Sequence, residues 1–167
     1  VMVDGQEVNT ANHPTSYEFA NIDSNHKIHV VYEPAPKVEN PTKTFDKQVY
    51  HDGDKVESTI VASQTGIEGS VAKNVVIADA SNDTLKFDLD SVSAKIVGNH
   101  GSSEPVITKD EATGSFRVTI AEFKGGDAVN VKVNGKAITK NEKIVNDATV
   151  TALGKTSNVH AEAASVY

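Results

Sequence analysis

The sequence predicts an all-β protein built as a β-sandwich, on three observations. Short stretches alternate apolar and polar residues, as in "TLKFDL" (residues 84–89) and "AVNVKV" (residues 128–133). Turn-forming residues separate these stretches at short intervals, as in "HDGD" (residues 51–54). No long stretch repeats its apolar residues with the period of a helix. Short strands at such regular spacing are typical of an antiparallel sandwich.

The individual strands follow from the same alternation. Successive side chains of a strand point to opposite faces, so each alternating stretch bounded by turn residues is expected to be one strand. The predicted strands cover residues 18–22, 27–33, 42–50, 55–63, 73–79, 84–89, 93–97, 115–123, 128–133, 143–150 and 158–166. The Asn-Gly pair at residues 134–135 predicts a tight turn.

Three prolines mark a boundary near the N-terminus. Pro34, Pro36 and Pro41 lie in "EPAPKVENP", which has no apolar periodicity and predicts a stiff linker. We therefore expect a short N-terminal β segment over residues 1–34, a linker over residues 35–41 and a main domain over residues 42–167. Because residue 1 already falls inside a pattern, we expect the chain to be a fragment, with signal and anchor outside it.

The composition argues against several classes of function. With 167 residues, of which 38% are hydrophobic and 23% charged, the chain should fold around a real core. A formal charge of −7 argues against a nucleic-acid partner. No apolar run is long enough for a transmembrane helix, so we expect no membrane partner. The absence of cysteine excludes disulfides, thiolate metal sites and cysteine nucleophiles.

No motif indicates a cofactor or a metal. The sequence has no P-loop, no dinucleotide fingerprint and no G-x-S-x-G. His26 and His29 are three apart, so a strand would point them to opposite faces. The aspartates between residues 79 and 90 form no EF-hand-type loop. We therefore expect no cofactor, no metal and no enzymatic turnover.

Most predicted strands of the main domain have one apolar face that forms the expected core. Its expected members are Phe45, Val49, Val56, Ile60, Ala62, Val75, Ile77, Leu85, Phe87, Leu89, Phe116, Val118, Ile120, Val129, Val131, Val133, Ile144, Ala148 and Val150. Polar residues share the phase of these faces in a few strands. The charged and amide misfits are Lys43 and Lys47 in one strand, Asp79 in a second and Asn146 in a third.

Each misfit also has an ordinary explanation. A lysine commonly guards a strand edge, an aspartate can cap a turn, and a buried asparagine can be a hydrogen-bonded core amide. Left without a partner, a buried amide costs about 1–3 kcal/mol. Asn158, in "TSN", is a rival to Asn146, but it lies near a turn and outside the apolar rhythm.

Together, a lysine, an aspartate and an asparagine can form an amide. The lysine amine attacks the carboxamide carbon and expels ammonia. Burial favours this reaction, because it lowers the pKa of a lysine and raises the pKa of an aspartate. The neutral amine becomes a nucleophile, and the protonated aspartate can polarise the amide and relay protons. The event occurs once per molecule, so it is self-modification.

Four separated motifs then resemble a known family. They are a Lys-Thr first strand and a Gly-Asp turn, both in "PTKTFDKQVYHDGDKVESTIVAS", a Val-Val-x-x-Asp strand in "AKNVVIADAS", and a closing Asn-x-Ala-x-Val strand in "EKIVNDATVTA", which is followed by "TSN". In this order they are similar to the isopeptide-forming immunoglobulin-like domains of Gram-positive surface proteins and pilins. The resemblance implies an Ig-like sandwich in which Lys43 is joined to Asn146 with the help of Asp79. The residues themselves leave Lys47 and Asn158 as alternatives. The sequence departs from the family pattern at Ser58, where an aromatic residue is common, and at "DASNDT" (residues 79–84).

The N-terminal piece carries a second, shorter resemblance. "VDGQEV" and "YEFANIDSNHKIHVVYE" are similar to the closing half of a small β-repeat of bacterial surface proteins. Both resemblances imply an extracellular, cell-wall-anchored protein whose partners are its own neighbouring domains.

Three functions are compatible with these expectations. The first is a stalk segment stabilised by a bond that closes a loop of about a hundred residues, for which loop-closure reasoning gives around 4 kcal/mol. The second is a ligand-binding adhesin module that contacts a host protein or glycan, with residues 98–114 as its candidate surface. The third is an accessory β-domain of an extracellular carbohydrate-active enzyme.

Overall fold

The computed structural model describes residues 34–140 and 143–166, together with four short strands among the first 33 residues. The chain divides into two compact units, Val1–Pro34 and Ala35–Tyr167. In the first unit, β1 (Met2–Val3) pairs antiparallel with β2 (Gln6–Glu7), and β3 (Ser16–Glu18) with β4 (Lys27–His29). Most of the stretch that resembles a β-repeat lies outside the described residues, so that resemblance stays a prediction.

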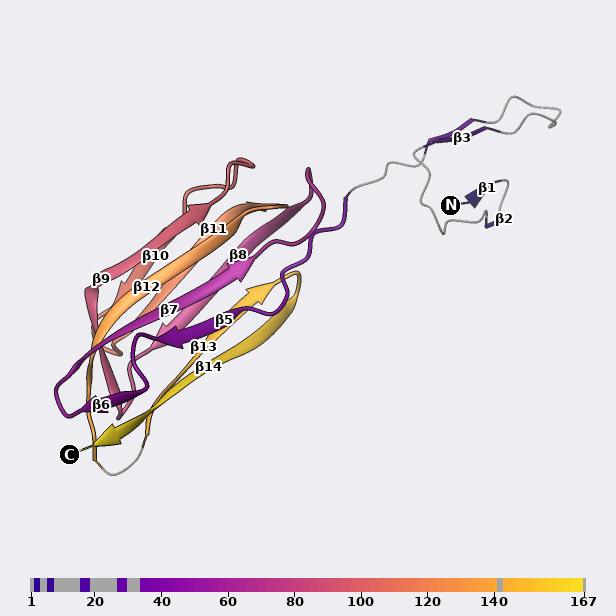
Figure 1. The fold of residues 1–167 in the computed structure, drawn as a ribbon. Coiled ribbons are helices and arrows are strands. Elements are labelled where there is room, and N and C mark those ends of the chain that lie inside the picture. Colours follow the sequence, from indigo (N-terminus) through magenta and orange to yellow (C-terminus); the bar gives the residue numbers. More distant parts are fainter. Residues whose placement is uncertain are drawn as a thin grey trace. The chain divides into compact units, whose positions relative to one another are not determined.

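The second unit consists of a six-stranded and a four-stranded sheet (Figure 1). The larger sheet has the order β10-β11-β8-β13-β14-β6, and the smaller has the order β5-β7-β12-β9. Their strands are β5 (Thr42–Phe45), β6 (Val49–His51), β7 (Lys55–Ser63), β8 (Val71–Ala80), β9 (Leu85–Val97), β10 (Val106–Asp110), β11 (Ser115–Lys124), β12 (Ala128–Ala137), β13 (Ile144–Ala152) and β14 (Lys155–Val166). Neighbouring strands are antiparallel, except that β6 runs parallel to β14. The prediction of an all-β sandwich is therefore confirmed.

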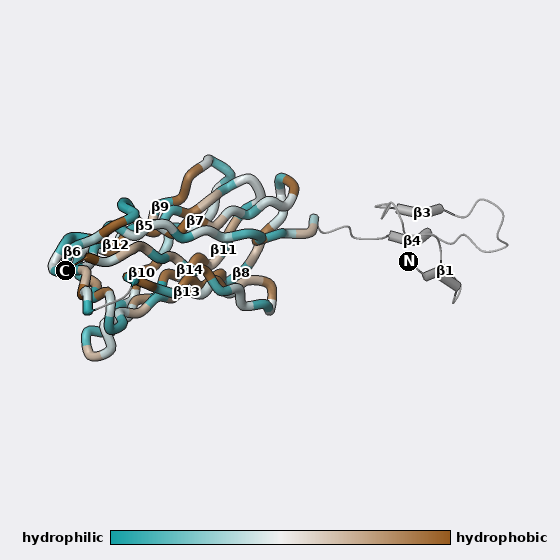
Figure 2. Tube along the Cα trace, turned by 60° about the horizontal axis from the view of Figure 1, so that its bottom comes forward, coloured by the Kyte–Doolittle hydropathy of each residue, from teal (hydrophilic) through white to brown (hydrophobic). Residues whose placement is uncertain are grey.

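The core lies between the two sheets, on the faces that the alternation predicts. Apolar and polar segments alternate along the strands in Figure 2. The predicted inward apolar residues of β7, β8, β11, β12 and β13 are all buried, and so are Leu85, Phe87 and Leu89 of β9. Because these side chains leave water together, burial of this apolar surface is the main stabilising contribution to the fold.

The predicted strand over residues 42–50 is interrupted, which corrects its inward face. Strand β5 ends at Phe45, and the chain returns to strand conformation as β6 at Val49. Tyr50 is fully buried, whereas Val49 is 46% exposed, so the prediction of Val49 as a core residue is wrong. The Tyr50 hydroxyl donates to Asp46 Oδ1 at 2.6 Å and accepts from the Lys47 backbone N–H at 2.8 Å. These bonds stabilise the interruption between β5 and β6. After it, Tyr50 points into the core in place of Val49.

The Asn-Gly pair at residues 134–135 forms no turn, which corrects that prediction. It lies within β12, where Gly135 pairs with Val56 on one side and Phe87 on the other. A Cβ at Gly135 would come within 2.7 Å of Leu85 Cδ1 and 2.8 Å of the Lys86 carbonyl oxygen. The lack of a side chain at Gly135 therefore allows β12 and β9 to pack closely at this point.

Residues 35–41, expected as a linker, are part of the second unit. Val38 forms a β-bridge with Gln64 and packs against the core. The Lys37 carbonyl accepts from the Thr65 N–H at 2.7 Å. This segment is thus fixed to the sandwich by its own backbone, which its proline content alone does not reveal.

The connection at residues 98–114 contains the strand β10, which pairs with β11 along its whole length. Its first part is held by the buried Asp127, whose carboxylate accepts from the Ser102 hydroxyl at 2.6 Å. Among the described residues, no helix is long and apolar enough to cross a membrane.

Candidate functional site

Three polar side chains from three strands meet between the two sheets. Lys43 comes from β5 in the smaller sheet, and Asp79 and Asn146 come from β8 and β13, which are neighbours in the larger sheet. Their residues are 6%, 4% and 1% exposed, respectively. The Lys43 Nζ donates to Asp79 Oδ2 and to Asn146 Oδ1. The structure therefore brings together the lysine, the aspartate and the asparagine that stood out as misfits in the sequence.

Strand phase explains why these side chains point inward. Lys43 lies directly opposite the buried Ile60 in the β5–β7 pair. Asp79 continues the buried series of β8 by one step, and Asn146 stands between two buried residues of β13. Since alternate residues of a strand share a face, each polar side chain is forced into the core by its apolar neighbours.

The remaining polar atoms of the site are paired with the backbone of Ala80. Its N–H donates to Asp79 Oδ1 at 2.8 Å, and its carbonyl oxygen accepts from Asn146 Nδ2 at 2.9 Å. One carboxylate oxygen and the amide oxygen are left to face Lys43. The amide plane of Asn146 is thereby fixed with its oxygen toward the lysine and its nitrogen toward β8.

Aromatic rings form an apolar wall beside the lysine. The Lys43 Nζ lies 5.7 Å from the centre of the Phe87 ring. Phe116 packs edge-on against Phe87, with 5.7 Å between ring centres and 62° between planes. The sequence predicted both rings as core, but it carried no signal that either one would lie next to a particular polar side chain, because that depends on the pairing of distant strands.

Burial governs the protonation of the site. It lowers the pKa of the Lys43 amine and raises the pKa of the Asp79 carboxyl, because a charge is poorly solvated in the core. The attraction between the two groups opposes both shifts and is the smaller effect in each. Both shifts move the pair toward a neutral amine and a protonated carboxyl beside the amide of Asn146, which is the arrangement that amide formation requires.

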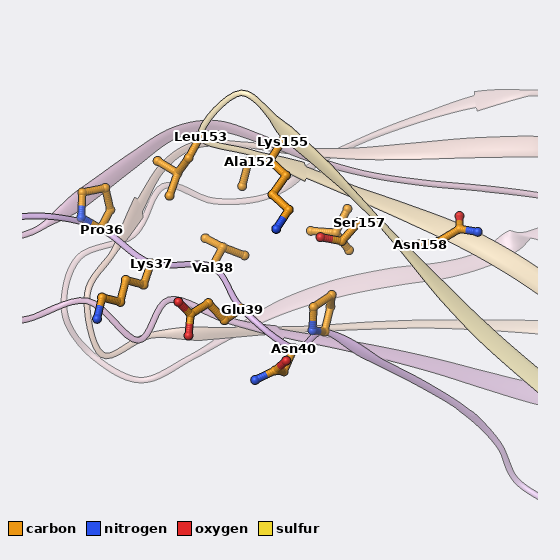
Figure 3. Close-up of a pocket in the computed structure, with 12 residues that line it drawn as sticks. Pro36, Lys37, Val38, Glu39, Asn40, Ala152, Leu153, Lys155, Ser157 and Asn158 are labelled. Carbon is orange, nitrogen blue, oxygen red and sulfur yellow. The ribbon is translucent and has the colours of Figure 1, made fainter.

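The alternative residues lie elsewhere. Lys47 falls in the break between β5 and β6, where its residue is exposed. Asn158 is exposed on β14 and lines an open pocket of about 650 Å³ between residues 36–41 and the β13–β14 hairpin (Figure 3). The charged residues that line this pocket are all exposed. The pocket therefore lacks a buried titratable pair such as Lys43 and Asp79.

Ser58 and the lack of a metal-binding cluster in the described residues are two further features of this region. Ser58 is buried, and its hydroxyl has no hydrogen-bond partner within the described residues. Ser58 is the position where the family commonly has an aromatic residue. It lies on β7 directly opposite Phe45, and β7 is the strand that pairs with the Lys43 strand, β5. In the described part of the chain, no group of three or more His, Asp or Glu side chains could hold a metal ion.

Comparison with known proteins gives matches of structure but not of sequence. No protein-family model matches the chain, and neither does any curated protein sequence. The N-terminal domain of the Streptococcus gordonii adhesin Sgo0707 is similar, with a TM-score of 0.59 and 12% identity over 75% of this chain. A collagen-binding domain from a Staphylococcus aureus adhesin has a TM-score of 0.53 and 17% identity over 72%. The RrgB pilus backbone of Streptococcus pneumoniae has a TM-score of 0.51 and 16% identity over 72%.

The matched region is a different share of each of these proteins. It covers 95% of the collagen-binding domain, but only 32% of the solved Streptococcus gordonii chain and 32% of the RrgB chain. At such low identity the likeness establishes the fold. The chain has the Ig-like β-sandwich fold found in adhesin and pilin domains of Gram-positive bacteria.

Proposed function

We propose that this chain, with the fold of Gram-positive adhesin and pilin domains, is a structural segment of an extracellular bacterial surface protein. In this proposal the sandwich is stabilised by an isopeptide bond between Lys43 and Asn146. The observation that carries it is the contact of the Lys43 amine with both Asp79 and Asn146 inside a closed apolar site. The fold it shares with surface adhesins and pilins supports the setting.

The reaction needs only these three side chains. The neutral Lys43 amine attacks Cγ of Asn146 and forms the new C–N bond, while the protonated Asp79 donates a hydrogen bond to the amide oxygen. Asp79 then takes a proton from the attacking nitrogen and passes one to Nδ2. The Cγ–Nδ2 bond breaks and ammonia leaves, so one amide replaces another and no oxidant or cofactor is consumed.

The protein supplies proximity and a dry site. Because the sheets hold the amine against the amide, an otherwise slow bimolecular reaction becomes intramolecular. The site is buried beside the Phe87 ring, and this burial lowers the pKa of the amine and so favours its neutral form. The site is consumed by its own reaction, so the chain acts once and is not an enzyme.

Intact-protein mass spectrometry tests the proposal. The wild-type chain should weigh less than its sequence by one ammonia, and proteolysis should release a branched peptide that joins Lys43 to Asn146. The Lys43→Ala and Asn146→Ala variants should have full mass. The matched controls Lys47→Ala and Asn158→Ala should keep the deficit. A wild-type chain of full mass would reject the cross-link, and a deficit that survives Asn146→Ala would reject its acceptor.

In the surface protein, the segment would act as a spacer whose neighbours are further domains of the same polypeptide. A covalent tie replaces the disulfides that this cysteine-free chain cannot form. Repeated copies of this domain along the full-length protein would support the spacer role.

A further inference from the structure

The larger sheet is incomplete where it holds Asn146. The ladder between β8 and β13 consists of three residue pairs, at Thr149, Val150 and Thr151 of β13. On its other edge, β13 pairs with β14 from Ile144 to Ala152. The half of β13 that carries Asn146 therefore has a backbone ladder on one edge only.

Side chains from the β8–β9 turn occupy the missing edge. The Thr84 Oγ1 accepts from the Val145 N–H at 3.0 Å, and Asn82 Nδ2 donates to the Val145 carbonyl at 2.7 Å. The Thr84 hydroxyl also lies 2.9 Å from that carbonyl oxygen. Both backbone groups of Val145 that face β8 are thus bound by side chains in place of a strand, directly beside the residue that bears the reacting amide.

The turn that supplies these groups is itself fixed. Asn82 Oδ1 accepts from the Thr84 N–H at 2.8 Å and from the Leu85 N–H at 2.9 Å. The Thr84 carbonyl accepts from the Ile138 N–H at 2.8 Å. A rigid turn can hold Val145 at a defined depth, because its own bonds do not depend on β13.

We infer that Asn82 and Thr84 are positioning residues for the cross-link, an inference that rests on the proposed function. They hold the backbone of Val145 and thereby set the depth and orientation of Asn146 against Lys43 and Asp79. Intramolecular reactions are sensitive to such placement, and a shift of about 1 Å can cost about 10²-fold in rate. The β8–β13 ladder does not extend to Asn146, because its three pairs lie at residues 149–151 of β13.

A refolding time course tests the inference. The chain is isolated unfolded and uncross-linked, which its full mass verifies, then diluted from denaturant and quenched at intervals for intact-mass measurement. Thr84→Val keeps the shape of the side chain but removes its hydrogen bonds, and the loss of ammonia should slow about tenfold or more. Thr84→Ser restores the hydroxyl and should return the rate to within about twofold of wild type. The control Thr151→Val removes a β13 hydroxyl that pairs with Thr156 and should leave the rate unchanged.

A second readout separates positioning from general stabilisation. In the Lys43→Met background no bond can form, so the Asn146 side-chain amide can be followed by NMR. Adding Thr84→Val should increase hydrogen exchange of that amide while signals from β7 and β12 stay in place. Equal rates for Thr84→Val and Thr151→Val would overturn the inference, as would a slow Thr84→Val with an unchanged Asn146 amide.

If Thr84→Val does not fold, Asn82→Asp decides by the same criteria, because it keeps the Oδ1 acceptor of the turn and loses the donor to Val145. If the wild type never loses ammonia, the proposed function fails, and the Asn146 amide signals in the wild type and Thr84→Val still decide whether Thr84 positions that side chain.

Discussion

Lys43 and Asp79 form a pair in which two protonation patterns carry the same number of protons. The amine can be neutral with a protonated carboxyl, or the two can be an ammonium and a carboxylate. Burial favours the first pattern, since it lowers the pKa of Lys43 and raises the pKa of Asp79. The balance between the patterns does not depend on pH, so pH acts only by adding a proton to the pair or removing one.

This coupling predicts a bell-shaped dependence of the cross-linking rate on pH. At low pH the pair gains a proton, Lys43 becomes an ammonium and the rate falls. At high pH the pair loses its proton, Asp79 becomes a carboxylate and the rate falls again. Because the lysine pKa is lowered and the aspartate pKa is raised, the active window lies between the ordinary values of the two groups. Refolding time courses across acidic to alkaline buffers measure this profile.

The Asp79→Asn variant is the control for that profile. It keeps the volume of the side chain but cannot relay a proton, so it should be slower by about 10²-fold or more and should lack the high-pH decline. A rate that rises steadily with pH in the wild type would contradict the role of a protonated Asp79.

At the scale of the strands, sequence periodicity predicts most of the sandwich, and it finds the site through its exceptions. Lys43, Asp79 and Asn146 stood out because each shares the phase of an apolar face, and that phase is a local property of the sequence. Periodicity fails where a specific side-chain or backbone contact decides the structure. The Tyr50 hydroxyl breaks the first strand, and the close approach of β9 and β12 keeps Gly135 inside a strand. The Tyr50 bonds are local, to Asp46 and Lys47, but a side-chain hydrogen bond leaves no mark on the apolar alternation, and the approach to Gly135 involves residues about fifty positions away.

Strand β9 also differs from what the alternation of apolar and polar residues predicts. The sequence predicted two strands over this region, whereas the chain forms one strand whose inward face changes phase between Leu89 and Val92. The pairing with β12 is irregular between Lys132 and Asn134, and the Ser91 hydroxyl accepts from the Asn134 N–H at 2.8 Å. A bulge of this kind lets the apolar residues of both halves of a long strand point into the same core. The change of phase that it causes resembles the boundary between two strands when only the sequence is considered.

Gly135 allows a prediction about strand packing. The Gly135→Ala substitution should lower the free energy of unfolding by about 1–3 kcal/mol, because its Cβ must displace Leu85 or the Lys86 backbone. Chemical denaturation of the variant in the Asn146→Ala background measures this without the contribution of the cross-link. Lys132→Ala, at an exposed position of the same strand, should change the value little. An unchanged stability for Gly135→Ala would show that β9 and β12 can separate at no cost.

For the whole molecule, the positions of Lys43 and Asn146 in the fold determine which parts of the chain the proposed bond would connect. Asn146 lies on β13, the second-to-last strand, and is followed by β14. Lys43 and Asn146 lie in different sheets, so the bond would join the two layers of the sandwich. It would close a loop with a sequence separation of 103 residues, which corresponds to about 4–5 kcal/mol relative to the open unfolded chain. Residues 147–166 stay outside this loop.

The closed loop predicts how the domain responds to pulling at its two ends. Force that enters through residues 35–41 reaches Lys43, crosses the bond to Asn146 and leaves through β13 and β14, so the residues between the two linked positions carry no load. Unfolding of the Asn146→Ala variant should therefore release more chain than unfolding of the wild type. The difference should be about 350 Å, from the separation of 103 residues at about 3.3–3.6 Å each.

Single-molecule force spectroscopy on tandem copies measures this difference in contour length. Asn158→Ala is the matched control, and it should extend like the wild type because its exposed amide takes no part in the bond. In the wild type, only the strands outside the loop can peel away, and β14 is held by β13 on one edge and by three parallel pairs with β6 on the other. Equal contour lengths for wild type and Asn146→Ala would mean that force does not pass through Lys43 and Asn146, and the spacer role would lose its mechanical basis.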